Sequence, residues 1–288
     1  RHHLLDDEVS RSLLREYILS AYRLACQFSA FMEQVKPAVL VVFNGIMYPE
    51  AIAKRIAQDQ GVRVISHEVG LQPFSAFFTD GEATAYPIDI PADFELNQAQ
   101  NARLDAYLEQ RFQGKFSMAG IKFWPQISGL DAAFLERAAR FTQIVPVFTN
   151  VIFDTTQMYA NTVFSSMFAW LDELLPIISA HPDTLFILRA HPDESRSGKA
   201  SRESVGMWFE KNAASLQNIQ FIPPGEQVSS YDLVRVSKFV LTYNSTIGLE
   251  SILLGGPVLA AGQSPFNSFD TVFFEQDRAA YFRRLSGW

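Results

Sequence analysis

The order of apolar and polar residues along the chain predicts strands and helices in alternation. Residues 4–35 carry leucine, isoleucine and tyrosine at helical spacing. The run AVLVVF at 38–43 is apolar without interruption, which is typical of a parallel strand covered on both faces. A turn at Asn44-Gly45, a helix over 50–60 and a strand over 62–65 follow, so this part of the chain predicts a β-α-β unit.

From residue 141 onward the alternation is more regular, and it predicts a doubly wound α/β domain with a parallel sheet. The predicted strands are 144–148, 185–189, 219–222, 239–242 and 258–260. The predicted helices between them are 164–180, 202–212, 230–237 and 246–254.

Together these elements predict two Rossmann-like, doubly wound α/β domains. The first covers residues 1–130 and is short of strands, so we expect it to be incomplete or truncated. The second covers 131–262, and a helical tail occupies 263–288. The stretch 66–95 has no clear period and contains several glycines and prolines, which is typical of a binding loop.

The composition narrows the class of function. The chain has 288 residues with 24 basic and 31 acidic side chains, and its net charge of −7 argues against nucleic acid as a partner. The single cysteine, Cys26, excludes an internal disulfide and a zinc site of several thiolates. No apolar run reaches the roughly 20 residues that span a bilayer. We therefore expect a cytoplasmic protein, with peripheral association at the inner face of the membrane left open.

Polar residues that follow the predicted strands are candidates for a binding site, because open α/β sheets bind ligands at the carboxyl ends of their strands. Ser245 and Thr246 stand between a strand and a helix, where backbone amides and two hydroxyls suit a phosphate group. Gly248 would allow close approach, and Glu250 lies about one turn into the helix, where it could reach a ribose hydroxyl. The alternative is that Ser245 only caps the helix.

His191 follows the predicted strand 185–189 directly. Its imidazole could donate a hydrogen bond to a phosphate oxygen or act as an acid toward a leaving phosphate. A loop histidine with only a structural role is the alternative. Arg189 is the last residue of the strand and would pair with an acid or with the ligand.

In the first domain, Glu68 and His67 end the second predicted strand. The carboxylate could serve as a general base for an acceptor hydroxyl, with the imidazole as its competitor, and an ordinary loop pair is the alternative. The chain has no Gly-x-Ser-x-Gly elbow and no Gly-x-Gly-x-x-Gly after a strand. These absences argue against an α/β-hydrolase and against a nicotinamide-dependent oxidoreductase.

Two segments resemble a known family. RAHPDE at 189–194 and YNSTIGLESILLGGPVLAAG at 243–262 are similar to the donor domain of GT-B glycosyltransferases. The strongest similarity is to the bacterial capsule polysaccharide biosynthesis group, whose members include Kdo transferases. The resemblance covers 141–262 well and 38–81 more loosely. It implies two Rossmann-like domains of the GT-B type, with the acceptor side in the first and the nucleotide-sugar donor in the second.

The resemblance implies a donor site in the second domain. The phosphate contacts would be His191, Ser245 and Thr246, the ribose contact would be Glu250, and Asn150 would face the same cleft. GT-B enzymes usually need no metal and no further cofactor, since the nucleotide sugar is itself a substrate.

In the first domain, Glu68-Val69-Gly70 is similar to an acid–glycine element of the family, with one extra residue between the two. The expected function is transfer of a sugar from a nucleotide sugar to a growing surface or capsular glycan, carried by a glycan or glycolipid acceptor. If the donor is CMP-Kdo, Arg189 is a candidate to meet its carboxylate. A teichoic-acid-type glycerophosphotransferase, a sugar-nucleotide epimerase and a non-catalytic binding or scaffold protein of GT-B-like fold are the alternatives.

Overall fold

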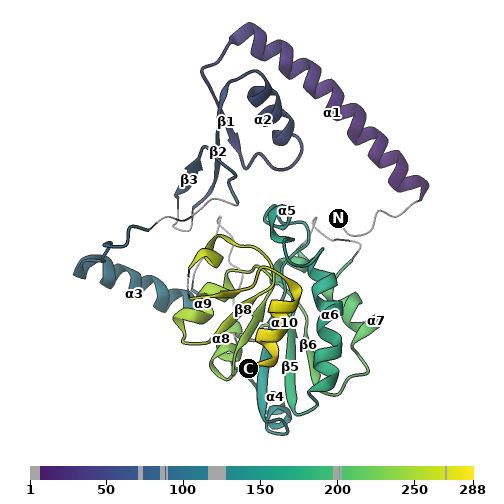
Figure 1. The fold of residues 1–288 in the computed structure, drawn as a ribbon, viewed down its shortest axis with the longest axis vertical. Helices are drawn as coiled ribbons and strands as arrows, with labels where there is room; N and C mark the ends of the chain where they lie inside the picture. The colour runs from purple at the N-terminus through teal and green to yellow at the C-terminus, as the bar shows by residue number, and fades with distance from the viewer. Residues whose placement is uncertain are drawn as a thin grey trace. The chain divides into compact units, whose positions relative to one another are not determined.

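The computed structural model of the chain forms two compact units, residues 1–86 and 87–288 (Figure 1). It describes residues 7–70, 74–84, 88, 90–115, 128–196, 201, 203–269 and 271–288. The division lies well before residue 130, where the sequence predicted a domain boundary. It lies earlier because helix α3 (Gln98–Phe112) packs on the second unit, where the ring centroids of Phe112 and Tyr231 are 5.1 Å apart.

Among its described residues, the first unit consists of two helices and a three-stranded sheet. Its elements are α1 (Glu8–Val35), β1 (Val39–Phe43), α2 (Glu50–Asp59), β2 (Arg63–Val69) and β3 (Ala76–Thr79). Strands β1 and β2 pair in parallel, which confirms the predicted β-α-β unit, and β3 adds an antiparallel strand. A small core of Met32, Val42, Ala57 and Val64 joins the helices to the sheet.

Strand β1 is covered on one face only within the described residues. Val42 is buried, whereas Val39, Val41 and Phe43 are 38%, 54% and 47% exposed. The prediction of a strand covered on both faces is therefore wrong here. Alternate side chains of a strand point to opposite faces, and an unbroken apolar run does not say which face will be covered.

Helix α1 has clear ends. It begins after Asp7, whose carboxylate accepts a hydrogen bond from the Ser10 amide at 2.7 Å, and it ends at Lys36 in the left-handed conformation. Among the described residues, no helix, α1 included, is both long and apolar enough to cross a bilayer.

The second unit contains a six-stranded parallel sheet of order β6-β5-β4-β7-β8-β9. The strands are β4 (Gln143–Phe148), β5 (Thr184–Arg189), β6 (Ile219–Ile222), β7 (Val240–Thr242), β8 (Val258–Ala260) and β9 (Phe273–Phe274). The helices after α3 are α4 (Ala132–Ala138), α5 (Gln157–Ala160), α6 (Met167–Ala180), α7 (Val205–Asn212), α8 (Ser230–Arg235), α9 (Ile247–Leu253) and α10 (Arg278–Ser286). All five strands predicted for this part of the chain are present, and β9 is the one that the sequence did not predict.

Helices cover both faces of this sheet, which makes the second unit a doubly wound α/β domain (Figure 1). On one face, α6, α7 and α10 contribute Trp170, Trp208 and Tyr281 to the core. On the other, α4, α8 and α9 contribute side chains such as Phe134 and Leu233. Every residue of β5 is buried, which explains why the strand is an almost continuous apolar run.

The C-terminal segment completes the second unit. Strand β9 pairs with β8, and Tyr281 and Leu285 of α10 are buried in the core. The indole of Trp170 in α6 donates a hydrogen bond to the Tyr281 hydroxyl at 2.8 Å. The predicted helical tail over 263–288 is therefore part of the fold of the second unit.

Replacing Leu241 of β7, which is fully buried, should lower stability strongly. We expect Leu241→Ala to reduce the free energy of unfolding by about 2–5 kcal/mol, because the change removes apolar contacts and leaves a cavity. The exposed Leu253 of α9 offers a matched control, and Leu253→Ala should change the same quantity by less than about 0.5 kcal/mol. Urea unfolding followed by circular dichroism measures both, and equal losses would contradict the assigned core.

Candidate functional site

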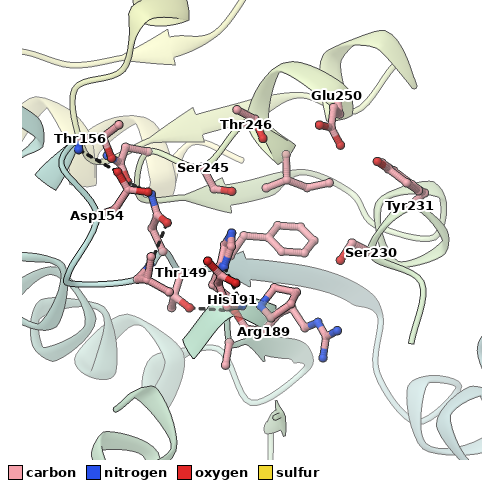
Figure 2. A pocket seen from close by; sticks show the side chains of 18 of the residues that line it. Thr149, Asp154, Thr156, Arg189, His191, Ser230, Tyr231, Ser245, Thr246 and Glu250 are labelled. Atoms are coloured by element: carbon pink, nitrogen blue, oxygen red, sulfur yellow. Dashed lines mark hydrogen bonds between the residues drawn. The ribbon is translucent and has the colours of Figure 1, made fainter. Parts of the chain in front are cut away.

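A cavity of about 360 Å³ lies at the carboxyl edge of the sheet in the second unit (Figure 2). It is formed by the loops after β4, β5 and β7 together with residues of α3, α8 and α9. Figure 2 shows Glu250 and Tyr231 on one side of the cavity and Asp154 and Thr156 on the other. The cavity has the size and the position expected of a small-molecule site in an open α/β sheet.

Most of the predicted donor-site residues meet at this cavity. Those that line it are Asn150, Arg189, His191, Ser245, Thr246 and Glu250. Gly248 does not line it. A Cβ atom at Gly248 would lie 3.1 Å from Cγ2 of Thr242 and 3.2 Å from the ring of Phe266, so the glycine lets α9 pack closely within the protein. The expected close approach of a ligand at Gly248 is replaced by this internal contact.

His191 presents a neutral hydrogen-bond donor. Its Nδ1 accepts a hydrogen bond from the Asp193 amide at 3.1 Å at the start of the short 3₁₀ helix η1 (Pro192–Ser195). The hydrogen of the neutral ring is therefore on Nε2. Burial lowers the pKa of His191 below its ordinary value, although the charges of Asp193 and Asp154 oppose this effect. At neutral pH the imidazole is thus an uncharged N–H donor.

Ser245 and Thr246 form the turn between β7 and α9. Thr246 occupies the N-cap position of α9 and makes no side-chain capping hydrogen bond. The alternative in which Ser245 caps the helix is therefore not what the structure shows, because the cap position belongs to the next residue. Both side chains line the cavity (Figure 2).

Asn150 holds two loops of the cavity together. Its Nδ2 donates to Oδ1 of Asn244 after β7 at 2.8 Å, and Gln157 donates to the same oxygen at 3.2 Å. The amide of Thr156 in turn donates to Oδ1 of Asp154 at 2.8 Å. This network fixes the loop after β4 beside the cavity and places Asp154 in its wall. The sequence did not identify Asp154, which lies in a loop without a recognisable motif. Asn244 lies in the YNSTIGLES segment, but its bond to Asn150 was not predicted.

Arg189 is tied to the protein backbone. It is 2% exposed, and its two terminal nitrogens donate to the carbonyls of Pro223 at 2.7 Å and Glu226 at 2.8 Å. Burial lowers the pKa of Arg189 to about 10, and the charge of Glu226 offsets this only in part. The side chain therefore links β5 to the loop after β6, whereas the sequence predicted an acid or the ligand as its partner.

Glu250 forms a buried ion pair that the sequence did not predict. Nε of Arg111, in the last turn of α3, donates to Oε1 of Glu250 at 2.9 Å. The hydroxyl of Tyr231 also hydrogen-bonds to Glu250. The pKa of Tyr231 is raised, mainly by burial and to a smaller extent by the negative charge of Glu250. Arg111 lies 139 residues before Glu250 in a polar helix, so no local motif marks it.

The candidate catalytic residues of the first unit point in opposite directions. Glu68 accepts from Nδ2 of Asn44 at 2.6 Å and from the Val69 amide at 2.9 Å. The ring of His67 lies between Phe43 and Phe78, with centroids 5.4 and 5.3 Å away. Because neighbouring residues of β2 face opposite sides of the sheet, the two cannot serve one ligand together.

The charges around the cavity are mostly engaged within the protein. Arg111 is paired with Glu250, and Arg189 binds backbone carbonyls. Asp154 and Asp193 also line the cavity. In the part of the chain that the structure describes, no three histidine, cysteine, aspartate or glutamate side chains are grouped as a metal ion would require.

The lowered pKa of His191 predicts a pH dependence of stability. Between the ordinary value of about 6.5 and the lower pKa of the folded state, the unfolded chain binds a proton that the folded protein does not. The free energy of unfolding should therefore fall as the pH drops through this window, and His191→Gln should remove this part of the loss. Urea unfolding between about pH 5 and 8 tests it. If the free energy of unfolding changed with pH in the same way for the wild type and His191→Gln, the assigned burial of His191 would be contradicted.

Comparison with curated proteins gives a distant relative, protein FixF of Sinorhizobium fredii (strain NBRC 101917 / NGR234), which is 25% identical over 266 residues. The match covers 87% of this chain and 55% of FixF. The chain thus spans about half the length of this curated relative.

Among solved structures, the chain is similar to the β-Kdo 2,4 transferase of KpsC from Thermosulfurimonas dismutans, with a TM-score of 0.53 and 14% identity. This match covers 85% of this chain and 75% of the matched chain. The β-Kdo 2,7 transferase of KpsC from the same organism gives a TM-score of 0.49 and 16% identity over 86% of the chain and 72% of that structure. The first of these matches shows a shared fold and confirms the predicted Rossmann-like α/β architecture of the GT-B type.

The family model described as capsule polysaccharide biosynthesis protein matches residues 123–279, which is more than half of the chain. The matched segment contains the strands β4, β5 and β7 and the loops after them that form the cavity. The chain therefore belongs to the capsule polysaccharide biosynthesis protein family, as its RAHPDE and YNSTIGLES segments predicted.

Proposed function

We propose that the chain is a glycosyltransferase that uses no bound metal and moves a sugar from a nucleotide sugar to a growing surface or capsular glycan. The observation that carries the proposal is one cavity that combines a neutral imidazole donor, two hydroxyls and a buried carboxylate. These groups suit a phosphate and a ribose at the carboxyl edge of a parallel sheet. Membership of a capsule biosynthesis family and the fold shared with a β-Kdo transferase support it.

In the proposed complex, the phosphate of the donor lies against His191, Ser245 and Thr246. Nε2 of the imidazole and the two hydroxyls donate hydrogen bonds to its oxygens. The ribose lies toward Glu250, whose carboxylate accepts hydrogen bonds from hydroxyl groups. The nucleotide then runs along the cavity from η1 toward α9.

We propose the following chemistry for the transfer. The bond between the anomeric carbon and the phosphate oxygen breaks, and its electron pair leaves with the phosphate. His191 and the two hydroxyls stabilise the charge that develops there. The acceptor hydroxyl forms the new glycosidic bond and loses its proton to a general base. For this role we propose the carboxylate of Glu68 in the first unit, which accepts hydrogen bonds from Asn44 and the Val69 amide.

We favour a donor with a single phosphate, such as CMP-Kdo, over a sugar nucleoside diphosphate. The groups that we assign to phosphate, one imidazole and two hydroxyls, are as many as a single phosphate group can use. The two arginines that line the cavity donate to Glu250 and to backbone carbonyls. The solved relative with a TM-score of 0.53 is itself described as a Kdo transferase.

Nucleotide binding tests the donor site. CMP should raise the melting temperature of the wild type more than CDP, UDP, GDP or ADP does. His191→Ala should weaken CMP binding by roughly 10- to 100-fold, since it removes a hydrogen bond to a charged group. His181→Ala is the matched control, because it also precedes a proline but lies at the exposed end of α6, and it should leave CMP binding unchanged.

Two outcomes would count against the donor site. If none of the five nucleotides stabilises the wild type, the chain has no nucleotide site of the proposed kind, and a scaffold role is favoured. If CMP binds but His191→Ala and His181→Ala behave alike, the phosphate lies elsewhere.

Sugar transfer tests the role of Glu68. Glu68→Gln should lower the turnover number by about 10²- to 10⁴-fold, because it removes the proton acceptor, and should leave CMP affinity unchanged. The readout is CMP release from CMP-Kdo together with mass spectrometry of a capsular oligosaccharide acceptor. Asp80→Asn is the control, since Asp80 lies after β3 and pairs with Arg63 on the surface. Equal turnover in Glu68→Gln and the wild type would remove Glu68 from the mechanism.

A further inference from the structure

The last turn of α3 is anchored at the wall of the cavity. Helix α3 begins with a capping box in which Asn97 and Gln100 exchange hydrogen bonds, and it ends beside α8. There Phe112 meets Tyr231 edge-to-face at 5.1 Å between ring centroids. This contact fixes the position of the preceding residue, Arg111, which is 7% exposed and lines the cavity.

Arg111 directs its guanidinium group at one oxygen of Glu250. Nε donates to Oε1 at 2.9 Å, and one terminal nitrogen donates to the same atom at 2.5 Å. The other terminal nitrogen donates to the Tyr107 hydroxyl at 2.9 Å, one turn earlier in α3. The planar group is therefore held from both sides, and it cannot rotate without breaking these bonds.

This pairing orients the carboxylate of Glu250. Burial alone lowers the pKa of Arg111, but the charge and hydrogen bonds of Glu250 outweigh it, so that its pKa is raised. Both side chains are about one-tenth exposed, at 9% and 10%. The guanidinium group therefore stays charged, and its two hydrogen bonds to one oxygen hold the carboxylate of Glu250 in place.

A carboxylate held in a fixed orientation is a selective partner for a ribose. The ribose of a nucleotide carries two neighbouring hydroxyl groups, and a carboxylate can accept from both. A 2′-deoxyribose carries one of them, so that one donor is missing and a buried acceptor loses a hydrogen bond. The loss should weaken binding by roughly tenfold or more.

We infer that Arg111 is a positioning residue for ribose recognition, which orients Glu250 so that the cavity distinguishes ribonucleotides from 2′-deoxyribonucleotides. Part of the nucleotide specificity thus resides in α3, which precedes the family-matched segment 123–279. The inference rests on the proposed binding of a nucleotide in this cavity.

The test compares the affinities of CMP and 2′-deoxy-CMP by isothermal titration calorimetry on the full chain. The wild type should prefer CMP by roughly tenfold or more. Arg111→Met should bring the ratio of the two affinities close to one, mainly by weakening CMP. Arg111→Lys keeps a positive charge but lacks the planar fork, and it should give an intermediate ratio. It also serves as the variant to measure if Arg111→Met does not fold.

A matched control separates positioning from general stability. Arg284 of α10 is half-buried and paired with Glu275 in the same unit. Arg284→Met should lower the melting temperature and leave the CMP to 2′-deoxy-CMP ratio at the wild-type value. A folded Arg111→Met or Arg111→Lys variant with the wild-type ratio would overturn the inference, as would a wild type that binds both nucleotides equally. A wild type that binds neither nucleotide would instead contradict the proposed CMP donor and remove the basis of the inference.

Discussion

Parallel pairing of β4 with β5 and β7 is the constraint on which the candidate site depends. Phe148, the last residue of β4, is level with Arg189 of β5 and with Thr242 of β7. Three chain segments therefore leave the sheet at one edge and at one height. The loops that follow bring Asn150, His191 and Ser245 to a common cavity, although almost a hundred residues separate the first from the last. An antiparallel arrangement of the same strands would send neighbouring loops to opposite edges.

The polar side chains at this edge divide into two kinds. Arg189 and Asn150 bond to the protein itself and hold the loops in place. Such bonds are needed because carbonyl and amide groups at strand ends are buried once helices cover both faces of the sheet. Nε2 of His191 and the hydroxyls of Ser245 and Thr246 are the polar groups that we assign to the donor phosphate. The side chains that bond to the protein strengthen binding by those assigned to the ligand, because a hydrogen-bond donor contributes more to affinity when its position is fixed in advance.

The strands and loops of the second unit could be predicted from the sequence for a physical reason. Strands buried on both faces, such as β5, require apolar side chains at nearly every position, and that produces a clear signal. Strand β9 has two residues and produces none. Strand β1 has the same apolar composition as a doubly covered strand, yet the described residues cover one face of it.

The candidate site shows the same contrast between local and distant information. His191, Ser245 and Glu250 lie in short segments next to strands, and their surroundings in the sequence identified them. Arg111 reaches Glu250 from a helix that precedes the first strand of its sheet, and Asn244 acts through side chains of another loop. Partners of this kind are set by tertiary packing, which a single sequence does not display. For the same reason the sequence predicted an acid or the ligand as the partner of Arg189, whereas its partners are two carbonyls of the neighbouring loop.

The hydrogen bond between Trp170 and Tyr281 has a consequence for how the protein can be divided. Tyr281 lies beyond residue 279, where the family match ends, and Arg111 lies before residue 123, where the match begins. A fragment cut to the matched segment would leave the buried indole N–H of Trp170 and the buried carboxylate of Glu250 without these partners. Such a fragment would also lose Leu285 from the hydrophobic core. The segment that matches the family model is thus shorter than the segment that supplies the buried contacts of the second unit.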